Sequence, residues 1–173
     1  MRLQEMIGLS VLEVEKGKQV GKVKDFLLTE TWEIQGLELE GKRLFSSTVK
    51  TVLWNDVIAY GEDAVMIVNK QAVRQTEAVD IQHTFLNGNG KVRDLPVVTA
   101  NGTRLGSVTD VYFDPKMGNT MIGLEISDGF ISDLMEGRRW LRYSADMKIG
   151  QDAVIVPEHC EQHLEKIITL VNG

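Results

Sequence analysis

The sequence predicts an all-β protein made of two small barrels in tandem. Three observations support this prediction: one set of motifs occurs twice in the same order, short apolar runs alternate with turn residues, and no long stretch has helical periodicity. Many short strands with regular turn signals are typical of all-β barrels or sandwiches. A chain of 173 residues is long enough for two such domains.

The repeat consists of three motifs whose two copies lie 85, 87 and 89 residues apart. This period is longer than the roughly 20–50 residues of solenoid repeats, so it indicates two similar domains. We predict a first domain over residues 1–78 and a second over 79–173, connected by 70–90. The paired motifs are GKQVGKVKD at 17–25 with GTRLGSVTD at 102–110, GLEL at 36–39 with GLEI at 123–126, and GEDAV at 61–65 with GQDAV at 150–154.

The elements of the first copy follow from short runs rich in β-branched and aromatic residues. Glycines explain how these runs connect: Gly17 and Gly102 are expected in tight turns, and Gly21 and Gly106 at bulges or sharp bends. We expect strands at 10–15, 20–29, 33–40, 42–49 and 64–69, and a short connection at 55–61.

The residues outside the repeat are expected to be partly helical. In the connecting segment, 71–78 is a candidate short helix, and the Asn-Gly-Asn-Gly run at 87–90 is a turn or flexible joint. In the tail, apolar residues at 164, 167, 168 and 171 have helical spacing, which predicts a short C-terminal helix after Pro157. Trp54 and Tyr143 occupy matching places near the end of each copy and are expected to anchor the core.

Composition narrows the classes of function. The net charge is −6, with −2 on residues 1–78 and −4 on 79–173, which disfavours a broad phosphate-binding surface. No apolar run approaches the ~20 residues that span a bilayer, and the N-terminus lacks the apolar stretch of a signal peptide. Cys160 is the only cysteine, which fits a reducing compartment. We therefore expect a cytoplasmic protein without a membrane span.

The three motifs, in this order and present twice, resemble the PRC-barrel family over about 7–69 and about 91–156. That family is named after the H subunit of the photosynthetic reaction centre and includes the C-terminal domain of a ribosome maturation factor. The resemblance implies two tandem PRC-type β-barrels used for assembly and protein contact, with no shared catalytic residues and no cofactor. This chain lacks the membrane helix of the first member and the N-terminal domain of the second, so neither specific role transfers.

Two equivalent acidic pairs suggest acid–base chemistry: Asp25 with Glu38, and Asp110 with Glu125. The simpler interpretation, which we favour, is that the aspartates accept backbone N–H bonds near a strand bend and that the glutamates face solvent. No catalytic residue is assigned.

His159 and His163 lie four residues apart around Cys160, a spacing that can bind zinc on a helix. His83 is the only other histidine, so a third ligand is not evident. A solvated tail with a semi-buried thiol is the favoured interpretation, and no metal site is assigned. Cys160 has no identifiable base beyond the same histidines, which disfavours a nucleophilic role.

The best candidate for function is the segment that breaks the repeat, residues 127–139. Its apolar residues share one face of a short helix and either pack on the barrels or contact a partner protein. Lys42 and Arg43 give the first copy a matching basic pair. The candidate partner-contact residues are Phe130, Ile131, Leu134, Met135, Arg138 and Arg139.

The function that we predict is a non-catalytic interaction or scaffolding module that docks onto a larger cytoplasmic assembly. One alternative is a factor associated with ribosomes or RNA processing, and another is a small-molecule or metal-binding domain. The sequence does not name the protein partner, and a homo-oligomer stays open.

Overall fold

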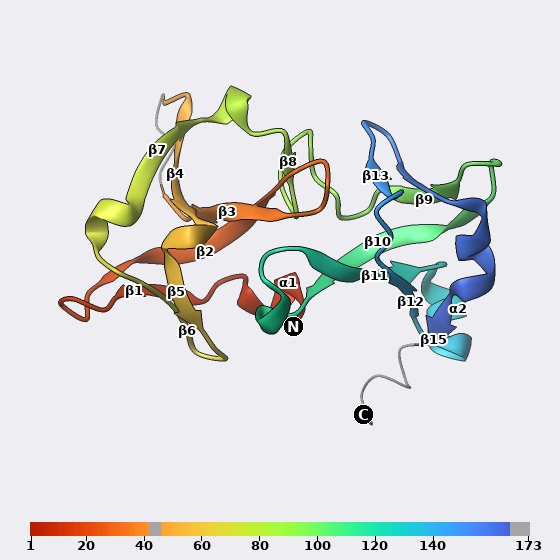
Figure 1. The fold of residues 1–173 in the computed structure, drawn as a ribbon, viewed down its shortest axis with the longest axis horizontal. Helices are drawn as coiled ribbons and strands as arrows, with labels where there is room; N and C mark the ends of the chain where they lie inside the picture. The colour runs from red at the N-terminus through yellow and green to blue at the C-terminus, as the bar shows by residue number, and fades with distance from the viewer. Residues whose placement is uncertain (42–45, 167–173) are drawn as a thin grey trace.

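Two curved sheets, one from each copy of the repeat, form the protein in a computed structural model that describes residues 1–41 and 46–166 (Figure 1). The first sheet has the order β5-β6-β1-β2-β3-β4-β7, with β8 paired to β2, and the second has the order β13-β14-β9-β10-β11-β12-β15. The strand order is therefore equivalent in the two copies, which confirms the predicted all-β tandem barrels.

The elements of the first copy begin with a single helical turn. In chain order they are α1 (Leu3–Met6), β1 (Ser10–Glu13), β2 (Gln19–Leu28), β3 (Ile34–Leu39), β4 (Thr48–Leu53), the 3-10 turn η1 (Trp54–Asp56), β5 (Val57–Tyr60), β6 (Ala64–Ile67), η2 (Lys70–Ala72), β7 (Val73–Glu77), η3 (Ala78–Asp80) and β8 (His83–Thr84).

The second copy repeats this arrangement and adds a second α-helix. Its elements are β9 (Pro96–Thr99), β10 (Arg104–Phe113), η4 (Pro115–Met117), β11 (Met121–Ser127), α2 (Phe130–Glu136), β12 (Arg139–Arg142), β13 (Lys148–Ile149), β14 (Val154–Val156), η5 (Glu158–His163) and β15 (Glu165–Lys166). Among the residues that the structure describes, no helix is long and apolar enough to cross a bilayer.

The glycine predictions are confirmed. Gly17 and Gly102 adopt φ of +63° and +93°, in the left-handed region that favours glycine. The pairing of β1 with β2 shifts register opposite Gly21, and that of β9 with β10 shifts beside Gly106. These bulges bend the long strands β2 and β10, so that each strand runs through its own barrel and on toward the other copy.

Four local predictions differ from the structure. The strand expected at 42–49 begins only at Thr48, as β4, and continues to Leu53, while residues 42–45 lie outside the described part. The candidate helix at 71–78 is mostly strand β7, because pairing with β4 along five residues outweighs local preference. The connection predicted at 55–61 contains strand β5. After Pro157 the chain forms the 3-10 helix η5 and then strand β15, so Leu164, the first of the apolar residues that predicted a tail helix, lies after the helix in extended backbone. The other three, at 167, 168 and 171, lie outside the described residues.

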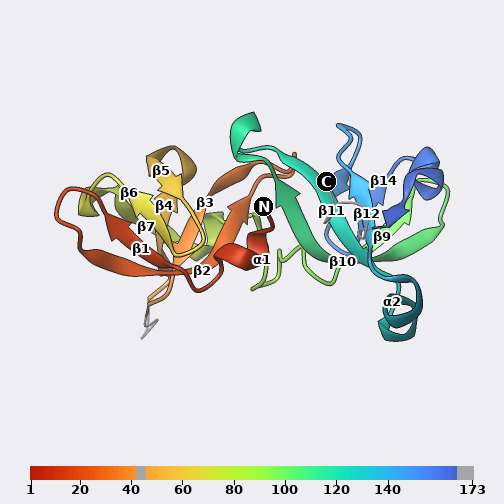
Figure 2. The same cartoon turned by 90° about the horizontal axis from the view of Figure 1, so that it is seen from below.

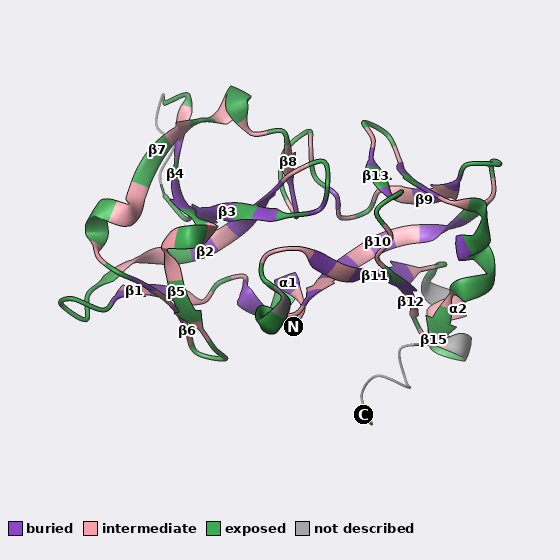
Figure 3. Ribbon diagram, viewed as in Figure 1, coloured by how far each residue is buried: buried purple, intermediate pink, exposed green. Residues whose placement is uncertain are grey.

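The buried apolar residues of both copies belong to one hydrophobic core cluster. Figure 3 shows buried stretches on the strands of both sheets. Backbone bonds join the sheets where β3 meets β11: the Ile34 N–H donates to Asn119 O at 2.8 Å, and the Met121 N–H donates to Trp32 O at 3.1 Å. Trp54 and Tyr143 are half-buried against this core, as predicted. The Trp54 ring also lies 5.8 Å from Phe113 of the second copy, measured between centroids.

The segment that precedes each copy pairs with the long strand of the other copy. Arg2 bridges to Tyr112 of β10, whereas β8, which precedes the second copy, pairs with Leu27 and Leu28 of β2. Figures 1 and 2 both show α1 between the two sheets, next to β10. This exchange of leading segments places the two acidic pairs beside the contacts between the copies.

Candidate functional site

Each copy holds one aspartate and one glutamate directly opposite each other on neighbouring strands. Asp25 of β2 pairs in register with Glu38 of β3, and Asp110 of β10 pairs with Glu125 of β11. The two aspartates are 0 % and 3 % exposed and the two glutamates 4 % and 2 %. The prediction that the glutamates face solvent is therefore wrong, because four consecutive residues of β3 and of β11 are covered on both sides of the sheet.

Asp25 is an acceptor for the segment that precedes the second copy. Its Oδ1 accepts N–H bonds from Phe26 at 2.8 Å, Phe85 at 3.1 Å and Leu86 at 2.9 Å. Its Oδ2 accepts from the backbone N and the side-chain Nδ2 of Asn87, at 2.8 and 3.1 Å. Both oxygens thus bind the chain's own donors, as the structural interpretation predicted.

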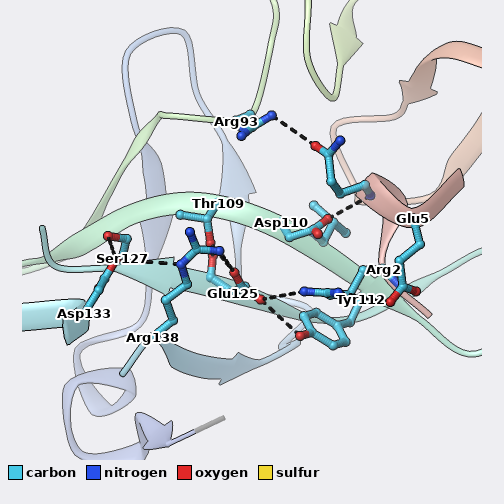
Figure 4. Close-up of polar contacts among 12 residues, drawn as sticks. Arg2, Glu5, Arg93, Thr109, Asp110, Tyr112, Glu125, Ser127, Asp133 and Arg138 are labelled. Carbon is cyan, nitrogen blue, oxygen red and sulfur yellow. Dashed lines mark hydrogen bonds and ion pairs between the residues drawn. The ribbon is translucent and has the colours of Figure 1, made fainter. Parts of the chain in front are cut away.

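Asp110 plays the equivalent part for the N-terminal segment, with fewer donors. Its Oδ1 accepts from the backbone N of Val111 at 2.8 Å and from that of Gln4 in α1 at 3.2 Å. The side chain of Gln4 is held by Arg93, whose Nη1 donates to Gln4 Oε1 at 3.0 Å (Figure 4). Asp110 therefore connects the first turn of the chain to the second barrel.

Glu125 lies at the centre of a polar cluster (Figure 4). Its Oε1 accepts from Arg138 Nη1 at 2.6 Å and from Thr109 Oγ1 at 2.9 Å. Its Oε2 accepts from the Tyr112 hydroxyl at 3.1 Å and lies 3.9 Å from Arg2 Nη1. Arginines from the N-terminal segment and from the end of the insertion thus compensate one buried charge.

Glu38, the equivalent residue in the first copy, forms an ion pair with Lys24 Nζ at 3.1 Å. The basic pair Lys42 and Arg43 lies outside the described residues. The two glutamates are therefore both paired with a cation, although the cation comes from a different element in each copy.

Burial raises the pKa of both aspartates. For Asp110 the pKa rises from 3.8 to about 6, because removal from water outweighs the two backbone donors and because the Glu125 charge lies nearby. Burial is also the main cause that raises the pKa of Asp25, against four opposing hydrogen bonds. The pKa of Tyr112 rises to about 12 through burial and the Glu125 charge, so its hydroxyl keeps its proton and donates it.

The geometry of these four carboxylates is that of structural anchors, which hold segments of the chain in place. A general acid or base must reach a substrate proton at hydrogen-bond distance, whereas these carboxylates are buried and bind donors of the chain itself. Their contacts explain instead why strands distant in sequence stay in register.

The histidines and the cysteine lie apart from this cluster, at η5. The rings of His159 and His163 are 5.7 Å apart between centroids, and His163 Nδ1 lies 2.7 Å from His159 O. Cys160 is buried, and burial raises the pKa of its thiol, which disfavours the thiolate. Within 1–41 and 46–166, no group of three or more His, Cys, Asp or Glu side chains is placed to hold a metal ion.

The insertion forms α2, which projects from the second barrel (Figure 2). Leu134 and Met135 are 72 % and 82 % exposed. The Ser127 hydroxyl holds the base of the helix by donating to Asp133 Oδ2 at 2.6 Å. Of the other candidate contact residues, Arg138 reaches inward to Glu125, Arg139 lies half-buried in β12, and the side chains of Phe130 and Ile131 lie outside the described part.

Sequence reasoning missed the partners of the acidic pairs. Arg2, Gln4 and Asn87 carry no local signal for this role, since they reach the carboxylates only through the exchange of leading segments. The pairing of Asp110 with Glu125 had a detectable signal, because both residues occur at fixed places in motifs that repeat in the same order.

The family assignment follows from the repeated topology and from a direct comparison. A family model described as the PRC-barrel domain matches the chain twice, over residues 1–74 and 89–162. The chain belongs to the PRC-barrel family. The resemblance inferred from the motifs is thereby confirmed, and PRC-barrel domains are generally non-catalytic. Comparison with curated proteins found no match.

Proposed function

We propose that this tandem PRC-barrel protein is a non-catalytic interaction module that docks onto a larger cytoplasmic assembly. The observation that supports the proposal is α2, the element by which the second copy departs from the first. It exposes Leu134 and Met135, two large apolar side chains that a barrel core would bury.

The mechanism is surface complementarity to a protein partner. The partner offers an apolar groove for Leu134 and Met135, with acidic groups at its rim near Arg138, whose side chain is 52 % exposed although it contacts Glu125. Apolar anchors of this kind carry most of the affinity at protein interfaces, and flanking charges contribute to selectivity. The hydrogen bond from Ser127 to Asp133 constrains the base of α2, and such constraint reduces the entropy lost on binding.

Affinity capture from the native host, with three forms of the protein, tests the proposal. Leu134→Asp is expected to abolish capture and to leave the fold intact. Val79→Asp is the matched control, because Val79 is 87 % exposed on η3, in the segment between the copies. Capture of the same partner by wild type and Val79→Asp but not by Leu134→Asp supports the proposal. Equal capture by Leu134→Asp, or unfolding of that variant, contradicts it.

The two other functions suggested by the sequence have separate tests. Co-sedimentation with ribosomal particles would support a ribosome-associated factor, which the net charge of −6 disfavours. Metal analysis of purified protein, with and without His159 and His163, tests the metal-binding alternative. Metal that is present in wild type and lost in the double variant would favour that alternative.

A further inference from the structure

The first barrel has an apolar outer surface on its parallel strands β1 and β6. Alternate residues of both strands are buried in the barrel, so the residues between them point outward. The pairing continues beyond β1 to Val14, whose N–H donates to Ile67 O at 2.9 Å. Val14 and Val68 are 54 % and 49 % exposed. We call this surface the β1–β6 face, and its apolar residues are Leu12, Val14, Met66 and Val68, with Ala59 of β5 opposite Met66.

The equivalent face of the second barrel has smaller side chains at its end. Strands β9 and β14 pair in the same parallel register as β1 and β6. This register places Ala100 where the first copy has Val14, and Pro157 where it has Val68. A barrel of this topology therefore does not require large apolar residues at these places. Their exposure in the first copy is typical of a surface that binds another protein.

Charged residues of opposite sign lie at the two ends of the β1–β6 face. The turn between β5 and β6 carries Glu62 and Asp63, at the end where β1 and β6 begin. The hairpin between β1 and β2 carries Lys16 and Lys18, and Lys70 follows β6, all at the end where the two strands finish. These five side chains are exposed. The face thus has an acidic end and a basic end.

Two exposed residues reduce this asymmetry without removing it. Lys22 pairs with Ser10 near the acidic end, and Glu15 lies in the hairpin at the basic end. The acidic end keeps an excess of one negative charge and the basic end an excess of two positive charges. In the second copy, the equivalent turn has Gln151 in place of Glu62, and the hairpin at 100–103 has no charged residue. The charge pattern is therefore specific to the first copy.

We propose that the β1–β6 face is a homodimer interface, in which it packs against the same face of a second copy of this chain. The two-fold axis lies between the two sheets and runs across the strands. Such an axis reverses the strand direction, so the acidic end of each copy lies over the basic end of the other. An axis along the strands would bring ends of like charge together, which disfavours that arrangement.

The interface is separate from α2, which lies at the opposite end of the molecule from β1 and β6 (Figure 2). Dimerisation through the first barrel therefore leaves α2 accessible in both copies. A dimer presents two α2 helices, which raises the effective affinity for an assembly that offers repeated binding sites.

Sedimentation velocity on the full chain tests the apolar part of the interface. Wild type is expected to dimerise with a Kd of about 1–100 μM. Val14→Asp is expected to raise this Kd at least about tenfold, because each dimer would bury two unpaired carboxylates, and to leave the circular dichroism spectrum unchanged. Ile155→Asp is the matched control, since Ile155 is the equivalent of Met66 on the second barrel and is 41 % exposed; its Kd should equal that of wild type.

Charge reversal tests the direction of the two-fold axis. One double variant carries Lys16→Glu and Lys18→Glu, and the other carries Glu62→Lys and Asp63→Lys. Each alone is expected to raise the Kd at least about tenfold, because like charges then face each other at both ends of its dimer. An equal mixture of the two is expected to form a heterodimer, because opposite charges again meet at both ends.

Three results would overturn the proposal. The first is a wild type that stays monomeric up to about 100 μM. The second is a mixture of the two charge-reversed variants that stays monomeric. The third is a dimer that Leu134→Asp or Ile155→Asp abolishes and Val14→Asp does not, which would assign self-association to α2 or to the second barrel. Should Val14→Asp fail to fold, the charge-reversed pair decides, since all four of its substituted residues are exposed.

Discussion

Replacement of Asp25 by asparagine is expected to destabilise the protein strongly, although the two side chains are nearly isosteric. The carboxylate accepts five hydrogen bonds, three on Oδ1 and two on Oδ2. An asparagine side chain offers one oxygen acceptor and one NH₂ donor. In either orientation, at least two N–H donors would face an NH₂ group.

The magnitude follows from the cost of leaving buried donors without an acceptor, about 1–3 kcal/mol each. Asn87 is an exposed residue, so water can accept hydrogen bonds from its donors when they lose the carboxylate. Removing the buried charge, whose pKa is raised by burial, offsets a further part. We therefore expect Asp25→Asn to lower the free energy of unfolding by about 2–4 kcal/mol, a large share of the ~5–15 kcal/mol typical of a domain.

Urea denaturation followed by circular dichroism measures this change. Asn87→Ala is the matched control, because it removes one side-chain donor and keeps the backbone N–H on the carboxylate. It is expected to cost less than about 1 kcal/mol. If Asp25→Asn costs no more than Asn87→Ala, the carboxylate does not hold the segment, and the reasoning is refuted.

Three further predictions concern the second barrel and the contacts between the copies. Asp110→Asn is expected to raise the free energy of unfolding at pH 7 by up to about 3 kcal/mol, because burial raises the pKa of Asp110 from 3.8 to about 6 and the wild type therefore loses stability as pH rises through this range. In urea titrations the gain over wild type should shrink to below about 1 kcal/mol at pH 4, and a gain independent of pH would contradict the prediction. Leu3→Ala should cost about 2–5 kcal/mol in the same assay because its side chain is fully buried, and a cost below about 1 kcal/mol would show that the N-terminal segment is not part of the core. Gly123→Ala should lower the melting temperature sharply, because a Cβ there would lie 2.2 Å from the Trp140 ring, whereas Gly61→Ala meets nothing within 4 Å and should be nearly neutral; equal effects of the two changes would contradict the packing described.

The fold class was predictable because the duplicated residues are the ones that shape a barrel. Gly17 and Gly102 set the turns, and a shared aspartate in each long strand accepts backbone N–H bonds, as expected. These features are local or follow from equivalence between the copies. A duplicated motif predicts a structural role well, since two copies of one bend need the same residues.

Burial of the glutamates was not predictable from strand alternation. In β3 both Leu37 and Glu38 are buried, because neighbouring elements cover both faces of the sheet. A period of two residues separates inside from outside only where one face meets water. Glu38 and Glu125 are tolerated there because Lys24 and Arg138 pair with them.

The exchange of leading segments has no local signature either. Nothing in the first six residues indicates that Gln4 bonds to a strand more than one hundred positions away. Likewise, the strand over 73–77 was predicted as helix, since its pairing with β4 is a tertiary effect. The contacts at α2 could not be predicted from the local sequence either. The insertion can be detected because it interrupts the repeat, whereas the contact of Arg138 with Glu125 has no such signal.

The central structural claim is that the two PRC barrels are one cooperative unit, joined by a continuous core and by leading segments that each pair with the other copy. Hydrogen exchange across a urea series, read separately on β2–β3 and on β10–β11, tests it most directly. We predict the same unfolding midpoint for both strand pairs in wild type, and a common shift of both in Asp25→Asn. Two separate midpoints, with only the first copy responding to that substitution, would contradict the claim.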